Sequence, residues 1–426
     1  MIHRLTREEI DFYLDRRAGQ GFNVVQTVLL SEFDGLKTPN PYGDLPLFGR
    51  DPTRPDTTAG SDPADPAAYD YWDHAEFAVR AAAQRGILLG LVSAWGEYVV
   101  PRAGGKCFDT PEQAYAYGHF LGTRFRGHSN IVWILGGDRH PDERPEGIAL
   151  WRAMAEGIAD GTNGVNRLDG MADWTSSCMT HHSYNSSSNW FHGDPWIDFH
   201  MWGSYHADFS VARAHRVAAD DWNLPNPKPT LNAESAYEDH PVNWLERNGR
   251  FTAYDTRQAA YWSVFSGACG HTYGCHSVWQ FYNGRRQPIS LAAMAWQEAL
   301  DLPGACQMGY LRRLIESKSM FERIPDQTLI SGDPGDGSNH AVACCGRGYA
   351  LVYLPTGYPV TIRIGKIEGR EVTASWFDPR TGEETSIGTF AKSAERAFDP
   401  PGMSRELEWL QTGRGCDWVL VLEGKE

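Results

Sequence analysis

Two acidic residues, Asp138 and Glu234, each end a short apolar segment of the sequence. These segments cover residues 131–138 and 229–234, and small residues directly precede each acid. Short apolar runs of this kind are typical of buried strands in a parallel sheet. In a parallel barrel, the C-terminal ends of the strands carry the loops that build the active site. The two acids therefore predict a catalytic pair of carboxyl groups, which is what hydrolysis of a glycosidic bond requires.

The sequence around these acids alternates between strand and helix patterns as far as residue 281. Apolar, β-rich segments predict strands at residues 22–30, 87–95, 131–138, 174–182, 197–202, 229–234 and 276–281. Helical patterns occur at residues 5–21, 71–85, 111–125, 146–160 and 255–266, and Thr6 with Glu9 forms a capping-box pattern at the first of them. The alternation predicts the α/β class and, for residues 1–325, a (β/α)8 catalytic barrel of the TIM type.

The number of predicted strands falls one short of such a barrel, which has about eight. Because the sequence begins with a helical pattern, we expect the missing strand to be the first one. Residues 326–426 have a different pattern, with short strands predicted at 340–343, 348–354, 360–364, 371–377 and 418–422. This pattern predicts an antiparallel β-sandwich. The sandwich would brace the barrel or bind glycan, and Trp376 and Phe377 would serve either role.

The composition excludes several classes of partner. The chain has 426 residues and a net charge of −15, which argues against nucleic acid. No apolar stretch reaches the roughly 20 residues of a membrane span, and no signal peptide is visible, so the compartment is left open with the cytoplasm as default. The eight cysteines fit no zinc-site spacing, and no phosphate-binding glycine motif occurs, so no cofactor or metal is expected. The 16 tryptophans suit a carbohydrate partner or a large aromatic core.

Four motifs resemble those of the apiosidase-like glycoside hydrolases. They are GFNVVQ at 21–26, WILGGDR at 133–139, SSSNWFH at 186–192 and GHTYGCHSVWQ at 270–280. This barrel family includes glycoside hydrolase family 140, whose characterised activity is on apiose linkages of the pectin rhamnogalacturonan-II. The resemblance implies a retaining mechanism, with Asp138 as acid/base and Glu234 as nucleophile, and a C-terminal β-domain often labelled collagen-binding. Family members normally open with a strand carrying a Gly-Asp-Thr-Ala-Trp-like motif, and this sequence lacks it, as the strand count also indicates.

Several other residues near the predicted strand ends are candidates for substrate binding. Aromatic rings can stack on a sugar, and polar groups can bind its hydroxyls. The candidates are Trp95, Glu97, His182, His200, Trp202, Tyr205, His276, Trp279 and Gln280. The alternative role for the tryptophans is burial in the barrel. For the histidines it is a role in the core; a metal site is less favoured, because no HExxH pattern occurs.

The two acids also have alternative roles that the sequence leaves open. Asp138 could pair with Arg139, and Glu234 could pair with Arg257, as ordinary ion pairs. Glu238 and Asp239 follow Glu234 closely and are expected to be surface or cleft-rim acids. Our main hypothesis is a retaining glycoside hydrolase that acts on a polysaccharide or a pectin-type side chain. The alternatives are a carbohydrate-binding protein without turnover on a degenerate barrel, and an inverting hydrolase. The sugar, the linkage and the oligomeric state are not determined by the sequence.

Overall fold

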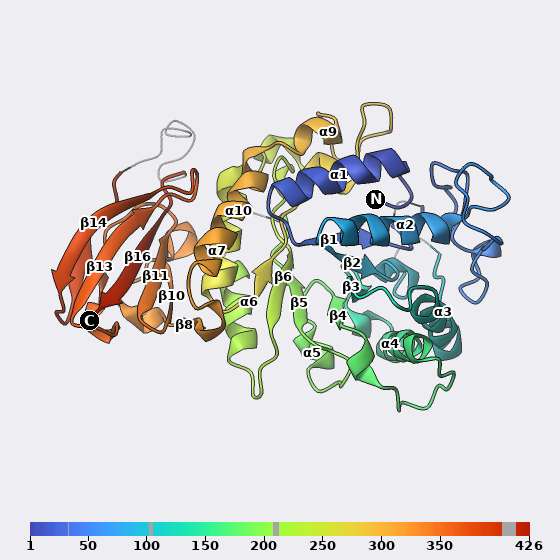
Figure 1. The fold of residues 1–426 in the computed structure, drawn as a ribbon, viewed down its shortest axis with the longest axis horizontal. Coiled ribbons are helices and arrows are strands. Elements are labelled where there is room, and N and C mark those ends of the chain that lie inside the picture. The colour runs from blue at the N-terminus through green and yellow to red at the C-terminus, as the bar shows by residue number, and fades with distance from the viewer. Residues whose placement is uncertain (33, 102–104, 208–212, 403–414) are drawn as a thin grey trace. The chain divides into compact units, whose positions relative to one another are not determined.

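The computed structural model describes residues 1–32, 34–101, 105–207, 213–402 and 415–426 (Figure 1). The chain forms two compact units, residues 1–202 and residues 203–426. The boundary between the two units falls inside a strand, so each unit is described below by itself.

The first unit is built around a four-stranded parallel sheet (Figure 1). The strands are adjacent in chain order: β1 (Val24–Val28), β2 (Leu88–Val92), β3 (Ile131–Gly136) and β4 (Met179–His182). Helix α1 (Arg7–Gly19) precedes β1, and the crossovers between the strands contain α2 (Tyr71–Gln84), α3 (Pro111–Arg124) and α4 (Gly147–Asn163). The alternation predicted from the sequence is therefore confirmed for these elements. The parallel register also places Gly136 beside His182, so β3 and β4 end next to each other.

Local sequence signals set the helix boundaries in this unit. The side chain of Thr6 accepts a hydrogen bond from the backbone of Glu9 and the carboxylate of Glu9 accepts one from Thr6, which confirms the predicted capping box. Asp70 caps α2 in the same way, together with Asp73. Helices α3 and α4 approach closely because they meet at glycines. A Cβ atom on Gly118 would lie 2.2 Å from the carbonyl oxygen of Met154.

Shorter elements complete the first unit and lead into the second. Helix α5 (Ser188–Phe191) precedes β5 (His200–Gly203), whose last residue opens the second unit. The second unit continues with α6 (Arg213–Trp222), β6 (Thr230–Glu234), α7 (Ala253–Phe265) and β7 (Gly270–His271). Strands β5, β6 and β7 form a three-stranded sheet, in which β6 and β7 run parallel with Leu231 opposite Gly270.

The prediction of the last barrel strand is wrong. Residues 276–281 were expected to be extended, but His276–Trp279 forms the short helix α8, and the strand lies earlier, at Gly270–His271. Helices α9 (Trp296–Ala299) and α10 (Pro303–Glu316) follow. Up to residue 322 the described segments contain seven strands, in one sheet of four and one of three. A closed ring of eight strands is therefore not observed in the described part of the chain.

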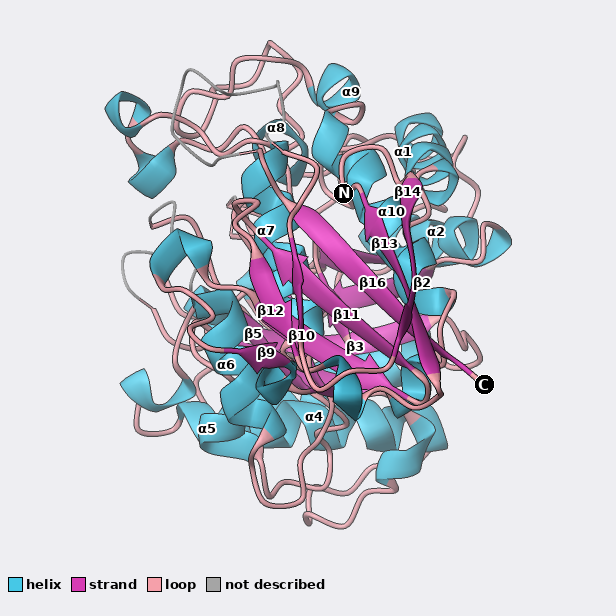
Figure 2. Cartoon of the chain, turned by 90° about the vertical axis from the view of Figure 1, so that its left-hand side faces the viewer, coloured by secondary structure: helices cyan, strands magenta, loops and turns pink. Residues whose placement is uncertain are grey.

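The C-terminal part of the second unit consists of antiparallel strands, as predicted (Figure 2). A six-stranded sheet has the order β14–β13–β16–β11–β10–β8, and a three-stranded sheet has the order β15–β12–β9. The strands are β8 (Ile324–Pro325), β9 (Ile330–Ser331), β10 (Val342–Gly346), β11 (Tyr349–Leu354), β12 (Val360–Ile362), β13 (Glu371–Phe377), β14 (Glu384–Ala391), β15 (Arg396–Phe398) and β16 (Trp418–Lys425). Both sheets contribute to one apolar core, which includes Trp376. Trp376 is therefore a core residue of this domain and not a binding surface.

A buried ion pair links helix α7 to the C-terminal sheet. The guanidinium of Arg257 donates two hydrogen bonds of 2.8 Å to Asp417, the residue directly before β16, and a third of 2.6 Å to Gln307 on α10. Both members of the pair are almost completely buried. Next to this pair, the rings of Tyr261 and Tyr353 stack with centroids 4.8 Å apart. These contacts support a bracing role for the C-terminal domain, and they show that Arg257 pairs with Asp417.

Two further sequence expectations concern the cysteines and the membrane. All eight cysteines are free thiols. In the described ranges, every helix is too short or too polar to cross a membrane.

Candidate active site

Asp138 lies on a tight turn that starts at the end of β3. Gly136, Gly137 and Asp138 have φ angles of 86°, 148° and 50°, so three consecutive residues have positive φ. Glycine is also required at position 137 by space, because a Cβ atom there would lie 2.6 Å from the ring of Trp95. A left-handed conformation at the non-glycine Asp138 costs about 1–2 kcal/mol. Strain of this kind clusters at functional sites. The two glycines thus turn the chain so that the acid follows directly after the strand.

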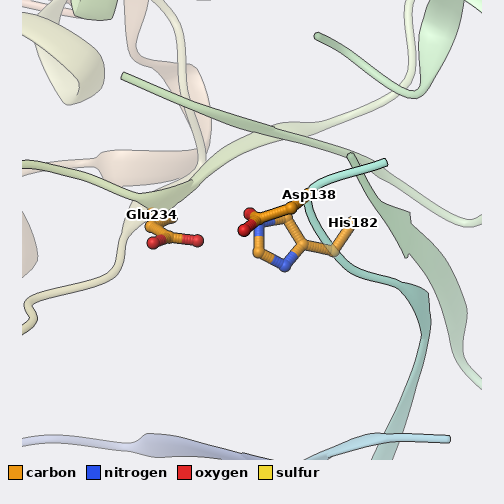
Figure 3. A group of neighbouring side chains, drawn as sticks. All are labelled: Asp138, His182 and Glu234. Atoms are coloured by element: carbon orange, nitrogen blue, oxygen red, sulfur yellow. The ribbon is translucent and has the colours of Figure 1, made fainter. Parts of the chain in front are cut away.

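The ring of His182 accompanies this acid. His182 is the last residue of β4, and donor atoms of Asp138 and His182 lie within 4.8 Å of each other (Figure 3). Burial lowers the pKa of His182 to about 4, so its ring is neutral at pH 7. The indole of Trp95 meets the same ring edge to face, with centroids 5.8 Å apart. Asp138 therefore has a neutral aromatic neighbour, and both residues stand where the sequence predicted functional groups.

The sequence left open an ion pair between Arg139 and Asp138, but the salt bridge of Arg139 is formed with a different acid. Arg139 forms its salt bridge with Glu97, which lies in the one-turn helix Gly96–Tyr98 after β2. Glu97 was a candidate for binding sugar hydroxyls. Its recorded partner is Arg139, and the pair joins the loop after β2 to the loop after β3. This contact makes Glu97 a residue that positions the loop carrying Asp138.

Glu234 is the last residue of β6 and is only 8% exposed. Its backbone oxygen accepts hydrogen bonds from the backbone N–H groups of Ser204 and Tyr205, at 2.9 and 3.1 Å, so the segment after β5 is tied to this strand end. Burial raises the pKa of the Glu234 carboxyl group to about 7, and a hydrogen bond from Tyr237 opposes this shift. Both protonation states of Glu234 are therefore accessible near neutral pH, and a perturbed carboxyl group at a strand end is typical of a functional site.

His206 orients the carboxyl group of Glu234. Nδ1 of His206 accepts a hydrogen bond from the backbone N–H of Tyr237 at 3.4 Å, so the ring proton resides on Nε2, which donates to Oε1 of Glu234 at 3.1 Å. Burial lowers the pKa of His206 to about 3, so this donor is neutral. The ring of His240 stacks on His206 with centroids 4.3 Å apart. His206 is not among the candidates chosen from the sequence, although it follows a strand end just as Tyr205 does.

Four of the predicted binding residues are placed as structural groups. His200 begins β5, and its ring nitrogens lie 3.0 Å from Ser187 Oγ and 3.0 Å from His192 Nδ1. Trp202 is fully buried. Nε2 of His276 donates to the carbonyl oxygen of Ser290. Gln280 is also buried, and its amide group binds the backbone at residues 276 and 289. The polar atoms of His200, His276 and Gln280 thus bind protein groups, and the burial of Trp202 agrees with the alternative of a core role.

Two aromatic candidates lie in the second unit, as Glu234 does. Tyr205 has a φ of 57°, and its ring packs over Gly203, where a Cβ atom would lie 2.2 Å from the ring. Trp279 is partly exposed, and its indole N–H donates to Nδ1 of His276 at 3.4 Å. Both rings are held in place by neighbouring residues, which suits a group that positions a ligand.

The two acids that follow Glu234 are not equivalent to it. Glu238 was expected to be a surface or cleft-rim acid, and the surface position is wrong, because Glu238 is buried and accepts hydrogen bonds from the Gly304 backbone at the start of α10 and from the Tyr273 hydroxyl. A carboxylate at a helix N-terminus is stabilised by the helix dipole. Asp239 pairs with Arg250. Both acids therefore have structural partners.

Within the first unit, the carboxylate of Asp138 and the ring of His182 would also suit a metal ion, because carboxylate oxygen and imidazole nitrogen are both common metal ligands. Within the second unit, the hydrogen bond from the ring N–H of His206 already engages the carboxylate of Glu234.

Comparison with solved structures gives the class of the protein. A protein described as "Glycoside hydrolase" matches with a TM-score of 0.85 and 30% identity, over 100% of this chain and 90% of that chain. A glycoside hydrolase family 5 protein from Bacteroides vulgatus matches with a TM-score of 0.82 and 30% identity, over 100% of this chain and 86% of that chain. The fold is therefore that of a glycoside hydrolase with a TIM-like barrel.

Family models narrow this class. The model described as "Apiosidase-like, catalytic domain" matches residues 1–322, and the model described as "Putative collagen-binding domain of a collagenase" matches residues 324–423. The chain belongs to the apiosidase-like family, which confirms the resemblance found in the sequence. No curated protein matches it.

Proposed function

We propose that this protein is a retaining glycoside hydrolase in which Asp138 is the acid/base and Glu234 is the nucleophile. The observation that carries the proposal is the state of Glu234. It is a buried carboxyl group at the last position of a parallel strand, and the N–H of a neutral histidine points at it. In barrels of this class the active site lies at the C-terminal ends of the strands. Asp138 follows such an end in the first unit, and family membership supports the pairing of the two acids.

The reaction proceeds in two steps that the two acids share. The ionised carboxylate of Glu234 attacks the anomeric carbon while the bond to the leaving oxygen breaks and the carboxyl group of Asp138 donates its proton to that oxygen. This step leaves a glycosyl ester on Glu234. Asp138, now ionised, then takes a proton from a water molecule, whose oxygen attacks the same carbon and releases Glu234. The product keeps the anomeric configuration of the substrate, because each step inverts it once.

Family membership also supports a proposal for the substrate class. We propose a glycosidic bond in a polysaccharide or a pectin-type side chain, with an apiose linkage as the first choice, because the catalytic-domain model that matches is described as apiosidase-like. A first screen would use aryl glycosides of pectin side-chain sugars, including an aryl apioside, together with rhamnogalacturonan-II. No metal is required in this mechanism, so we expect a chelator to leave the rate unchanged. Loss of activity with a chelator, restored by added metal, would instead make Asp138 a ligand.

The two acids can be distinguished by kinetics with an aryl glycoside whose leaving group needs little protonation. Glu234→Gln should abolish release of the phenol, because no glycosyl ester can form. Asp138→Asn should release phenol in a burst and then turn over slowly, because only the second step still needs a base. Glu298→Gln, a change at an exposed position of α9, is the control and should leave both phases unchanged. Wild-type rates in either catalytic-site variant would refute the assignment.

The same protein and substrates also test the two alternatives, an inverting hydrolase and a binding protein without turnover. Proton NMR of the first-formed product separates retention from inversion, and an inverting enzyme would hold its carboxyl groups about 6.5–9.5 Å apart. A carbohydrate-binding protein without turnover would bind an oligosaccharide in a calorimeter and leave it intact after long incubation.

A further inference from the structure

The loop after β6 presents a tryptophan near Glu234 that neither the sequence analysis nor the proposed mechanism uses. We propose that Trp244, displayed by the loop of residues 241–250, is a stacking platform for a sugar ring of the glycan next to the bond that Glu234 attacks. This inference rests on the proposed function for the identity of the attacked bond. The platform itself is inferred from the geometry of the second unit alone.

The first observation is the exposure of the loop tip. The side chain of Trp244 is 47% exposed and that of Leu245 is 39% exposed. Loop tips normally carry small or polar residues, because exposed apolar side chains gain nothing from water. Two neighbouring residues also make a patch that is far too small for a protein partner, which needs about 800 Å² on each side. A small ligand with an apolar face fits a patch of this size.

The second observation is that the loop is held rigidly. Backbone hydrogen bonds join Val242 to Gly249 and Trp244 to Pro241, at 2.9 and 3.0 Å. The guanidinium of Arg250 binds both carboxylate oxygens of Glu246 and the backbone oxygen of Asp239. The loop is therefore preorganised, and a ligand that binds its tip would lose little free energy to ordering of the loop.

The third observation is strain at the tip. Asn243 and Trp244 have φ angles of 52° and 62°, so two successive non-glycine residues are left-handed. Such conformations cost free energy and persist where the surrounding structure enforces them, often at ligand sites. Here the backbone N–H of Asn243 donates to the carbonyl oxygen of His206 at 2.7 Å. The strained tip is thus bonded to the residue that holds Glu234.

The fourth observation is the arrangement of rings. The ring of Trp244 lies 4.4 Å from that of His240 and 6.0 Å from that of His206, and it is nearly perpendicular to both. The indole of Trp279 is perpendicular to Trp244 at 6.2 Å. Because His206 donates its N–H to Glu234, only one ring separates the Trp244 indole from the carboxyl group. Perpendicular neighbours fix the plane of the indole while part of it stays open to solvent.

The ligand implied by this arrangement is a carbohydrate ring. One face of a pyranose or furanose presents C–H groups that pack on an aromatic face, and its hydroxyl groups point outward to water and polar side chains. A sugar on Trp244 would lie beside the residue that Glu234 attacks, so the platform would recognise the chain around the cleaved bond and not the reacting carbon.

The experiment measures binding without turnover. Each variant is made in the Glu234→Gln background, and its dissociation constant is measured by affinity electrophoresis in gels that contain soluble pectin rich in rhamnogalacturonan-II. Trp244→Ala should weaken binding at least about fivefold to tenfold, since an aromatic contact of this kind is worth about 1 kcal/mol or more. Trp244→Phe, which keeps an aromatic face, should recover most of the affinity.

A matched control is available before the opposite end of β6. Trp222 is also a partly exposed tryptophan, but it ends α6 and precedes β6, whereas Trp244 follows β6. Trp222→Ala should leave the dissociation constant unchanged. Melting curves that match the parent protein would show that Trp244→Ala is folded.

The outcomes separate this inference from the proposed function. Binding that depends on Trp244, with no hydrolysis of any glycan by the wild-type protein, would refute the proposed function and support the platform. Hydrolysis by the wild type together with equal binding by Trp244→Ala and its parent would overturn the platform. Failure of the parent protein to bind this pectin would also overturn it, because the proposal requires that ligand class.

Discussion

The burial of Glu234 predicts that Glu234→Gln makes the protein more stable at alkaline pH. The pKa of this carboxyl group is raised from an ordinary value of 4.5 to about 7, because its charged form loses hydration. The folded state therefore binds the proton more tightly than the unfolded state does. The contribution of this group to stability is fully present below pH 4.5, and it is lost as the pH rises through 7. Glutamine has the same shape, can still accept the N–H of His206 and carries no charge.

The size of this effect follows from the pKa shift. A shift of one unit corresponds to about 1.4 kcal/mol, so the change from 4.5 to about 7 corresponds to about 3–4 kcal/mol. The entropy of unfolding is about 2.1 cal/mol/K per residue. If the whole chain unfolds together, the melting temperature of the variant should exceed that of the wild type by about 4 °C at pH 8. If the second unit unfolds by itself, the difference should be about 7 °C.

The assay is scanning calorimetry of wild type and Glu234→Gln at pH 5 and pH 8. At pH 5 the buried carboxyl group of the folded wild type is protonated and neutral, like the amide group that replaces it in the variant, so the two melting temperatures should nearly coincide. Glu298→Gln removes a charge from the surface of α9 and controls for the change in net charge. The reasoning would be refuted if the melting temperatures of wild type and Glu234→Gln differed by the same amount at both pH values. It would also be refuted if the wild type melted at a higher temperature than the variant at pH 8.

Further predictions concern the pH dependence of activity and the buried ion pair. If Glu234 is the nucleophile, kcat/KM of the wild type should fall about tenfold per pH unit below about pH 7, because only the ionised carboxylate attacks. A profile that stays flat down to pH 5 would contradict this role. Asp417→Asn should destabilise the protein by about 3–5 kcal/mol in urea unfolding, because the buried guanidinium of Arg257 loses its counter-charge. The double variant Arg257→Met with Asp417→Leu should recover much of that loss, and an undiminished deficit would argue against an electrostatic cause.

Much of the fold could be predicted because its signals are local. The boundary of α1 follows from Thr6 and Glu9, and both hydrogen bonds of the capping box are present. Strands β3 and β6 were found as short apolar runs, because a strand covered on both faces needs apolar residues at successive positions. In these cases the residues that determine the element lie within the element or next to it.

The strand predicted at residues 276–281 shows where local signals fail. The valine and aromatic residues there favour a strand by propensity. In the structure, the segment coils into α8, and the side chains of His276 and Gln280 bind the backbone of residues 289 and 290. Those partners lie about ten residues further along the chain, so the pattern within the segment does not reveal them. Tertiary hydrogen bonds thus override the propensity.

The site was predictable only where a strand end placed the residue. Asp138 and Glu234 could be selected because each closes an apolar run. His206 and Trp244 stand on loops, and the bond that joins these loops, from the Asn243 N–H to the His206 carbonyl, connects segments far apart in the sequence. Glu238 was misplaced for the same reason, since the helix end that it caps begins at Pro303. A loop residue takes its role from partners that the local sequence does not contain.

Burial raises the pKa of Glu234 to about 7, and histidines that are themselves neutral do not reverse this shift. An arginine or a protonated histidine beside this carboxylate would lower its pKa by attraction and hold it ionised at all working pH values. Burial instead lowers the pKa of His206 to about 3 and of its stacked neighbour His240 to about 2, so the pair supplies a hydrogen bond without a charge. The carboxylate is therefore oriented but only weakly stabilised, which keeps it basic, as suits a group that must form a bond to carbon. The same arrangement lowers stability above pH 7, so the melting experiment and the pH profile of activity examine a single cause.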